Sequence, residues 1–317
     1  MKVLIVGGAG YVGGAVTDLL CAKSTHHDHD ILVYDSLLYE ESYRKPVPFV
    51  RGDIRDRARL LPHLRWADVV IWLAAVVGDG ACALDPAAAV EVNQESVAWL
   101  AANFSGRIVF LSTCSVYGAA PDELTEDSPT NPLSVYASTK LAAEGYLTGS
   151  NALIFRLGTL FGISDTYSRV RFDLVLNTLT QRACRDGRIT VFGGEQYRPL
   201  LHVRDAARAI ISAIDQAETG VYNLASQNST ISILAGIVAG FFPDLVVDHT
   251  PQFFEDNRNY RVSSMKALTE LGFSPHLTVY DGIREVKQLL DEQRLTLPDH
   301  PRYWNDRHLA AASQGGR

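Results

Sequence analysis

Residues 2–13, KVLIVGGAGYVG, decide the fold. A short apolar run at residues 3–6 leads directly into Gly7, Gly10 and Gly13, and a helical pattern begins at Tyr11. Glycines at this spacing allow a tight turn and let backbone N–H groups approach a diphosphate at the N-terminus of a helix. A glycine trio also occurs in turns that bind nothing. Here a strand pattern precedes it and a helix pattern follows it, which favours a dinucleotide-binding turn.

An acidic residue follows the second strand pattern, which covers residues 31–34 and ends at Asp35. A carboxylate at this distance from the glycine turn can accept both ribose hydroxyls of NAD and would repel the 2′-phosphate of NADP. An aspartate after a strand can also cap a turn, but the glycine turn upstream favours the cofactor role. Asp53 and Ile54 close a third strand pattern and are candidates for the adenine end. The cofactor predicted from these residues is NAD.

Strand and helix patterns alternate over the first 160 residues. Apolar, β-branched runs predict buried parallel strands at residues 3–6, 31–34, 69–73, 108–111 and 153–157. Helical patterns lie between them at residues 11–23, 86–103 and 133–148. This alternation predicts an α/β protein with a Rossmann doubly wound parallel sheet.

The pattern becomes shorter and mixed after residue 165. Helices are predicted at residues 171–185, 203–216, 231–241, 263–271 and 279–293, with strands at 189–192 and 221–224. We expect an NAD-binding Rossmann domain at residues 1–165, with a strand–helix return near 200–225. A smaller mixed α/β substrate lobe covers residues 166–297. Residues 298–317 are expected to form a loosely held C-terminal tail and are assigned no role.

Composition narrows the class of protein. The net charge of −7 repels nucleic acid and anionic membranes, so we expect neither as a partner. The four cysteines are far apart, which argues against a disulfide framework and against a metal site. The chain opens on a strand pattern rather than a signal peptide, and it has no apolar run of membrane-spanning length. These features predict a soluble protein of the cytoplasm.

Tyr136 and Lys140 are the candidate acid/base pair. They are four residues apart in a predicted helix and therefore lie on one face. A free tyrosine has a pKa of about 10. The Lys140 ammonium and the positive nicotinamide of NAD are expected to lower that pKa. Residues 112–115 follow a strand at the edge where such sheets bind ligands, and Thr113 can position a substrate hydroxyl. An isolated Tyr-x-x-x-Lys is more often a surface pair, but the glycine turn upstream favours catalysis.

With these motifs the chain resembles the extended short-chain dehydrogenase/reductases, in the NAD-dependent epimerase/dehydratase branch that acts on nucleotide sugars. The resemblance runs from residue 1 to about residue 293. It implies that Thr113, Tyr136 and Lys140 are catalytic. It implies NAD contacts at Gly7, Gly10, Tyr11, Val12, Asp35, Asp53, Ile54, Leu73, Ala74, Ala75, Asn93, Tyr136 and Lys140. Substrate contacts are implied at Thr113, Cys114, Ser115, Asn177, Arg198 and Arg258.

Cys114 and Ser115 occupy the two positions that separate reaction types in this family. Members that resemble 4,6-dehydratases carry Asp-Glu there, and elimination of water needs such an acid and base. Their absence favours a C4 epimerase that works through a transient 4-keto sugar. A C4 dehydrogenase or ketoreductase is the alternative, and a 4,6-dehydratase or a non-catalytic NAD-binding protein is less favoured. Cys114 is either a reactive thiol or, more commonly, a small buried hydrophobe.

The resemblance also implies a nucleotide-diphosphate sugar as substrate and a homodimer. The predicted helices at residues 86–103 and 133–148 would form the dimer interface. Two stretches depart from the family pattern: residues 196–200 lack the usual Asp-Trp after Arg198, and residues 168–172 replace a Pro-rich segment. The nucleotide and the sugar are therefore left open.

Overall fold

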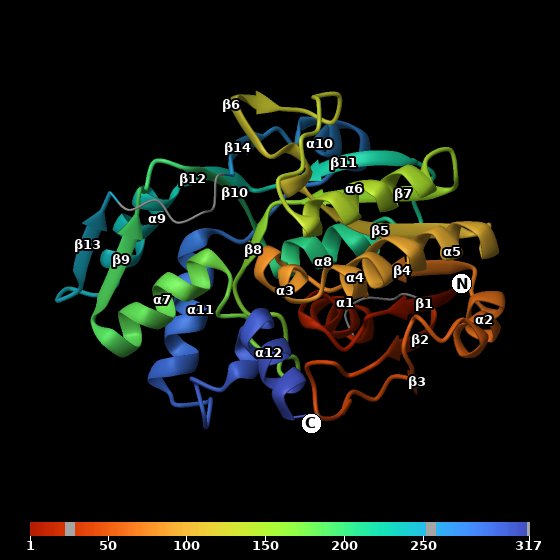
Figure 1. Cartoon of the computed structure of the whole chain (residues 1–317), viewed down its shortest axis with the longest axis horizontal. Coiled ribbons are helices and arrows are strands. Elements are labelled where there is room, and N and C mark those ends of the chain that lie inside the picture. The colour runs from red at the N-terminus through yellow and green to blue at the C-terminus, as the bar shows by residue number, and fades with distance from the viewer. Residues whose placement is uncertain (23–28, 252–257, 316–317) are drawn as a thin grey trace.

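The computed structural model describes residues 1–22, 29–251 and 258–315. Its centre is a seven-stranded sheet whose neighbouring strands all run parallel (Figure 1). In sheet order the strands are β11 (Gly220–Leu224), β7 (Ala152–Leu157), β5 (Arg107–Thr113), β4 (Val69–Trp72), β1 (Lys2–Val6), β2 (Asp30–Asp35) and β3 (Phe49–Arg51). The order steps outward in both directions from β1 and β4, which confirms the doubly wound parallel sheet.

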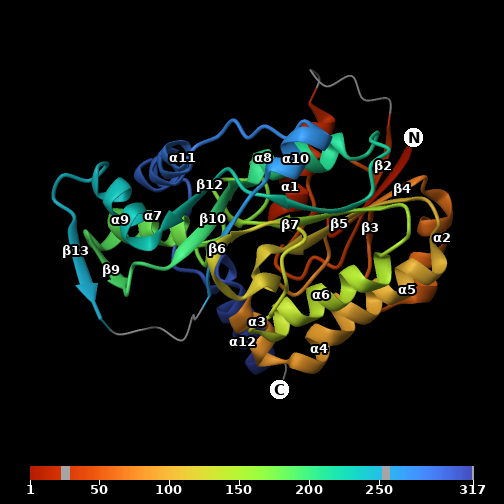
Figure 2. The same cartoon turned by 90° about the horizontal axis from the view of Figure 1, so that it is seen from above.

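Helices cover both faces of this sheet because its strands are apolar on both sides. In β1, Val3 and Ile5 face one core and Leu4 and Val6 face the other. Figure 2 shows α1 (Tyr11–Cys21) and α8 (Val203–Ser212) on one side of the sheet. On the other side lie α2 (Arg57–Trp66), α5 (Ser96–Asn103) and α6 (Val135–Leu147). Residue 23, which the sequence placed at the end of the first helix, lies outside the described residues.

The helix predicted at residues 86–103 is interrupted by a wider turn. It consists of α4 (Pro86–Val90), a π-helical turn (Glu91–Glu95) and α5. Asp85 begins it by accepting a hydrogen bond from the Ala88 N–H, with Pro86 in the first turn, as the sequence predicted. Widened turns of this kind are common at functional sites.

The second part of the chain builds smaller mixed sheets beside the carboxyl ends of the central strands (Figure 1). β10 (Tyr197–His202) pairs parallel with β8 (Thr159–Phe161) and antiparallel with β12 (Gln227–Thr230). The other pairs are β9 (Arg188–Phe192) with β13 (Val246–Thr250), and β6 (Ala119–Leu124) with β14 (Asn259–Val262). The helices that pack here are α7 (Val175–Asp186), α9 (Ile231–Ala239) and α11 (Val279–Asp291). Two further helices lie elsewhere: α3 (Asp79–Leu84) lies beside α6, and α10 (Met265–Leu271) packs on β11.

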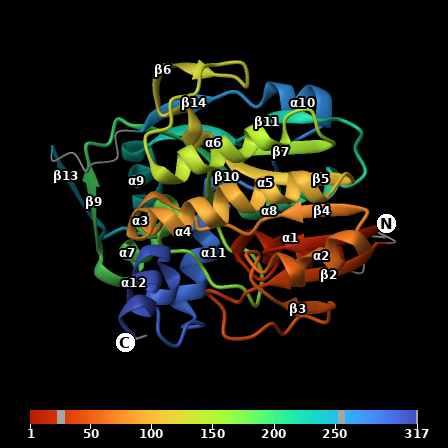
Figure 3. The same cartoon turned by 45° about the vertical axis from the view of Figure 1, so that its right-hand side comes forward.

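The C-terminal segment is folded, in contrast to the expected loose tail. A short 3-10 turn (Pro301–Tyr303) leads into α12 (Asn305–Gly315), which lies beside α3 (Figure 3). Tyr303 and Trp304 pack with Phe172 in a buried aromatic cluster. Burial of these large rings fixes the segment against the rest of the protein.

The helix predicted to begin at residue 171 starts instead at Val175. Arg171 stays outside because both of its guanidinium donors bind the Asp173 carboxylate, each at 2.9 Å. The same carboxylate accepts a hydrogen bond from the Asn305 N–H at 3.2 Å. None of the helices in the described ranges is long and apolar enough to cross a membrane.

A buried ion pair ties α6 to the sheet and provides a test of the fold. Glu144 on α6 binds Arg156 on β7 at 2.7 Å, and both side chains are buried. Glu144→Ala leaves the Arg156 charge buried without its partner, so the free energy of unfolding should fall by about 3–5 kcal/mol. The matched control is Asp248→Ala, which breaks the exposed pair with Arg188 and should cost less than about 1 kcal/mol. Urea unfolding measures both, and equal losses would contradict the assignment.

Candidate active site

A cleft of about 1100 Å³ runs along the carboxyl edge of the central sheet. Its lining includes Asp35 and Asp53 from the β2 and β3 side of the sheet, Tyr136 on α6, and Arg198 and Arg258 from the second part of the chain. This volume lies above the usual range for the site of a single small ligand. The cleft therefore has the size for a dinucleotide and a second ligand that meet near Tyr136.

The glycine turn forms the wall between β1 and α1. Gly7 has φ +88, and a Cβ added to it would lie 2.5 Å from the Ala74 nitrogen. A Cβ at Gly13 would lie 2.5 Å from the Gly7 carbonyl oxygen. Both positions therefore require glycine. α1 starts at the cleft without a side-chain cap on its N-terminus, as a helix that receives a diphosphate does.

Asp35 braces this turn from the end of β2. One carboxylate oxygen accepts a hydrogen bond from the Ala9 N–H at 3.0 Å, and the other accepts one from the Leu37 N–H at 2.7 Å. Burial raises the pKa of this carboxyl, and the two N–H donors oppose the rise. The residues thus fit the adenosine half of NAD: a glycine turn for the diphosphate and a carboxylate for the ribose.

Thr113 and Tyr136 meet in the middle of the cleft. Thr113 ends β5, while Tyr136 lies in the first turn of α6, which the Ser134 side chain caps through the Ala137 N–H. The Thr113 side chain lies close enough to the Tyr136 hydroxyl to lower the pKa of that hydroxyl, though by less than burial raises it. Burial raises the pKa of Tyr136 above its ordinary value, and the charge of Arg171 opposes this rise.

Lys140 lies one helical turn after Tyr136 and is buried. Its ammonium nitrogen sits 4.2 Å from the centre of the Phe110 ring. Burial lowers the pKa of Lys140 to about 7, and the charge of Glu144 opposes the drop. The sequence argument expected a lowered pKa at Tyr136. In the protein without NAD, burial outweighs that effect, so the lowering is left to the bound cofactor.

Most of the predicted site residues line this one cleft. They are Gly7, Gly10, Tyr11, Val12, Asp35, Asp53, Ile54, Leu73, Ala74, Ala75, Thr113, Ser115, Tyr136, Lys140, Arg198 and Arg258. Asn93, Cys114 and Asn177 are buried behind the wall of the cleft instead.

Asn93 supports the cleft from the π-helical turn. Its side-chain amide accepts a hydrogen bond from the Val76 N–H at 2.8 Å and donates one to the Val76 carbonyl at 2.9 Å. A third contact, at 3.3 Å, reaches the Thr139 hydroxyl on α6. Asn93 therefore positions the loop after β4 against the helix that carries Tyr136.

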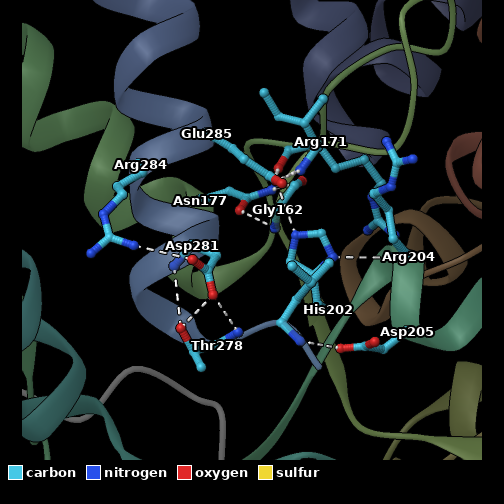
Figure 4. Close-up of polar contacts among 12 residues, drawn as sticks. Gly162, Arg171, Asn177, His202, Arg204, Asp205, Thr278, Asp281, Arg284 and Glu285 are labelled. Atoms are coloured by element: carbon cyan, nitrogen blue, oxygen red, sulfur yellow. Dashed lines mark hydrogen bonds and ion pairs between the residues drawn. The ribbon is translucent and has the colours of Figure 1, made fainter. Parts of the chain in front are cut away.

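Asn177, like Asn93, binds backbone groups with its side-chain amide, as Figure 4 shows. Its amide accepts a hydrogen bond from the Gly162 N–H at 2.9 Å and donates to the carbonyls of Gly162 and Arg171. Nearby, the buried His202 ring binds Glu285 at 3.0 Å and so joins β10 to α11. The α7 residues that line the cleft are others, among them Thr178 and Arg182.

Cys114 points into the protein core. Its thiol donates a hydrogen bond to the Arg156 carbonyl at 3.1 Å, and burial raises its pKa. This environment suits a small buried hydrophobe and not a reactive thiolate. Within the described ranges, no group of three or more His, Cys, Asp or Glu side chains is arranged to hold a metal ion.

Several residues that line the cleft were not predicted from the sequence. They are Asp79, Arg171, Asp173, Arg182, Trp304 and Arg307. They come from α3, from the segment before α7, from α7 itself and from the C-terminal segment, and no spacing rule connects these regions. The one available hint was that residues 168–172 depart from the Pro-rich stretch usual in the family.

The lowered pKa of Lys140 predicts a pH-dependent stability. Burial moves this pKa from 10.5 to about 7, so between these values the unfolded chain binds more protons than the folded one. Stability therefore rises with pH across that window. Lys140→Met should raise the melting temperature most at and below about pH 7, and its benefit should shrink by about 2 kcal/mol between about pH 7 and pH 9. Thermal unfolding without NAD measures it.

The control is Lys287→Met on the solvent face of α11, where the removed amine pairs with Asp291. Lys287→Met should not raise the melting temperature near neutral pH. A Lys140→Met gain that stays constant with pH would contradict the assignment.

Comparisons with known proteins identify the family of this chain. The model of the NAD dependent epimerase/dehydratase family matches residues 3–225. A UDP-glucose 4-epimerase of Lactobacillus helveticus is 29% identical, with 89% of this chain and 95% of that protein covered. A dTDP-glucose 4,6-dehydratase of Streptomyces niveus is 27% identical, with 93% and 94% covered.

A solved structure shares the fold. The UDP-glucose 4-epimerase of Thermotoga maritima, determined with UDP-glucose, has a TM-score of 0.80 at 21% identity and covers 93% of this chain and 100% of that one. The family model spans most of the chain, and the glycine turn and Asp35 provide the contacts that the cofactor needs. This chain therefore belongs to the NAD dependent epimerase/dehydratase family and uses NAD as its cofactor.

Proposed function

We propose that the protein is an NAD-dependent nucleotide-sugar epimerase that acts at C4 through a transient 4-keto sugar. The observation that carries this proposal is the position of Thr113 and Tyr136, where the NAD end and the arginine-lined end of the cleft meet. Cys114 and Ser115 follow Thr113 directly and provide no carboxylate for an elimination.

The glycine turn and Asp35 would hold NAD, which would supply a hydride acceptor in the first half of the reaction and a hydride donor in the second. Tyr136 takes the proton of the C4 hydroxyl in the first half of the reaction and gives a proton back in the second half. Thr113 hydrogen-bonds the same oxygen and orients it toward Tyr136. The raised pKa of Tyr136 makes it a ready acid for the second half, and the positive charge of bound NAD assists it as a base in the first half.

Lys140 holds the nicotinamide ribose in this proposal. With a pKa of about 7 it changes its protonation easily at neutral pH. When Lys140 is protonated, its charge interacts strongly with nearby groups, because a site without water has a low dielectric constant.

The far end of the cleft takes the nucleotide and its diphosphate. Arg198 and Arg258 line that end, together with Arg182 on α7. Guanidinium groups bind phosphate oxygens in a bidentate manner, so three of them suit a diphosphate. Asn177 contributes indirectly, by fixing the Gly162 and Arg171 backbone.

Three other functions are separated from this one by experiment. A C4 dehydrogenase or ketoreductase needs the same residues, and the segments at 75–78 and 156–177 resemble such enzymes. A 4,6-dehydratase is represented among the relatives, but this chain lacks the Asp-Glu pair that follows the catalytic Thr in similar dehydratases. A non-catalytic NAD-binding protein is disfavoured because Tyr136 and Lys140 are both present.

The proposal extends to assembly and location, and the family resemblance supports it. Two copies pair through the helices at residues 86–103 and 133–148, in the cytoplasm. Light scattering of the purified protein tests the pairing, and a monomer at micromolar concentration would contradict it.

The decisive test follows the C4 configuration by NMR with UDP-, dTDP-, GDP- and CDP-sugars. We expect interconversion of C4 epimers without net NADH formation. Tyr136→Phe removes the proton carrier, so turnover should fall about a thousandfold while NAD binding is kept. The matched control is Tyr146→Phe, at an exposed tyrosine on the same helix, which should retain full activity.

Each contrary result points to a different function. NADH that accumulates in step with product, without an epimer, would favour the dehydrogenase. A deoxy-keto product that carries solvent deuterium would favour the dehydratase. An unchanged rate in Tyr136→Phe would remove Tyr136 from the mechanism.

A further inference from the structure

Asp79 is an acidic residue inside the substrate end of the cleft. It begins α3 and lines the cleft with Arg258. One carboxylate oxygen accepts a hydrogen bond from the Ser134 hydroxyl at 2.7 Å. The other forms an ion pair with Arg258 at 3.0 Å. A carboxylate at this place is unexpected, because the end of the cleft that it faces must accept a diphosphate.

The contact with Ser134 places Asp79 beside the reacting groups. Ser134 is the N-cap of α6 and accepts a hydrogen bond from the Ala137 N–H at 3.2 Å. Tyr136 follows it by two residues. The Asp79 charge also contributes to the raised pKa of Tyr136, after the larger effect of burial. Asp79 therefore sits where the sugar, and not the nucleotide, would lie.

Arg258 connects this carboxylate to the diphosphate end. The guanidinium nitrogen that pairs with Asp79 also donates to the Ser115 hydroxyl at 3.3 Å. The Arg258 carbonyl accepts a hydrogen bond from Arg198 at 2.5 Å. Arg258 therefore contacts Asp79 and Ser115 through its guanidinium and contacts Arg198 through its backbone carbonyl.

The Asp79–Arg258 pair can exchange partners. The two side chains are 34% and 26% exposed, so the pair is only partly shielded from water and is held weakly. A diphosphate carries more charge than one carboxylate and matches the guanidinium fork in geometry. When Arg258 turns to a diphosphate, Asp79 loses its cation and gains acceptor capacity toward the sugar.

We propose that Asp79 determines the specificity for the sugar by exchanging partners. This inference rests on the proposed nucleotide-sugar substrate. Asp79 pairs with Arg258 in the free enzyme, releases Arg258 to the diphosphate, and then accepts hydrogen bonds from the sugar hydroxyls. The preferred sugar is an uncharged, hydroxylated hexose, because a uronate would bring a second carboxylate next to Asp79.

A purely structural role makes a different prediction. If Asp79 only joins α3 to α6 through Ser134, its loss would loosen the cleft and weaken every ligand. Partner exchange instead predicts opposite effects on two ligands. A free nucleoside diphosphate should bind better without Asp79, while the additional affinity that the sugar provides should fall.

The experiment is isothermal titration of NAD-loaded protein with UDP, dTDP, GDP and CDP, and then with the matching nucleotide-glucose. Asp79→Asn should tighten the nucleoside diphosphate about fivefold, because it removes the competing anion. The gain in affinity from diphosphate to nucleotide-glucose should fall about tenfold, because a charge-assisted hydrogen bond is lost. In an Arg258→Gln background, Asp79→Asn should leave the diphosphate affinity unchanged.

Two controls separate charge from structure. Asp122→Asn removes the same charge at an exposed position on β6 and should change neither affinity. Ser134→Ala breaks the contact with α6 but keeps the Asp79 charge, so it should not tighten the diphosphate.

The outcomes distinguish this proposal from the proposed function. If wild type binds a diphosphate and Asp79→Asn weakens that binding or leaves it unchanged, the proposed role of Asp79 is wrong but the nucleotide-sugar function still stands. Tightening that persists in the Arg258→Gln background would lead to the same conclusion. Failure of wild type to bind any of the four diphosphates would overturn the nucleotide-sugar function, and this proposal with it.

Discussion

The close approach of three backbone segments at the glycine turn is the constraint on which the rest of the site depends. Gly7 lies against Ala74 at the end of β4, and Gly13 lies against the Gly7 carbonyl, with no room for a Cβ at either place. This contact puts the N-terminus of α1 at the carboxyl edge of the sheet, next to Asp35. The cleft opens there, and α6 brings Tyr136 to the same edge from the far side of β5.

Burial acts on the reacting helix in two opposite directions. It raises the pKa of Tyr136 and lowers the pKa of Lys140, since both shifts favour the uncharged form. Glu144 lies one helical turn after Lys140 and forms an ion pair with Arg156 on β7. The two opposite charges of this buried pair balance each other. A dry site of this kind strengthens each remaining charge, which is what proton and hydride transfer require.

Local charge in the cleft differs from the charge of the whole chain. The net charge of −7 repels long polyanions, yet Arg182, Arg198 and Arg258 all line the cleft. In the proposed function these few guanidinium groups bind a small diphosphate, which the distant field affects little because salt screens that field beyond about 10 Å. Other arginines of the cleft are paired with acidic side chains, as Arg171 is with Asp173, so their charge is already neutralised within the protein.

The sequence by itself determined the parallel sheet and the use of NAD, and it predicted the glycine turn with Asp35 and the trio Thr113, Tyr136 and Lys140, which all line one cleft. These features depend on short-range rules: apolar runs, glycine spacing and residues four apart on a helix. Only the tertiary structure decided that Asn93, Cys114 and Asn177 lie behind the cleft wall, that α12 packs beside α3, and that Asp79 meets Arg258. The reason is that the direction of a buried side chain depends on which distant segments pack around it, and no local spacing carries that information.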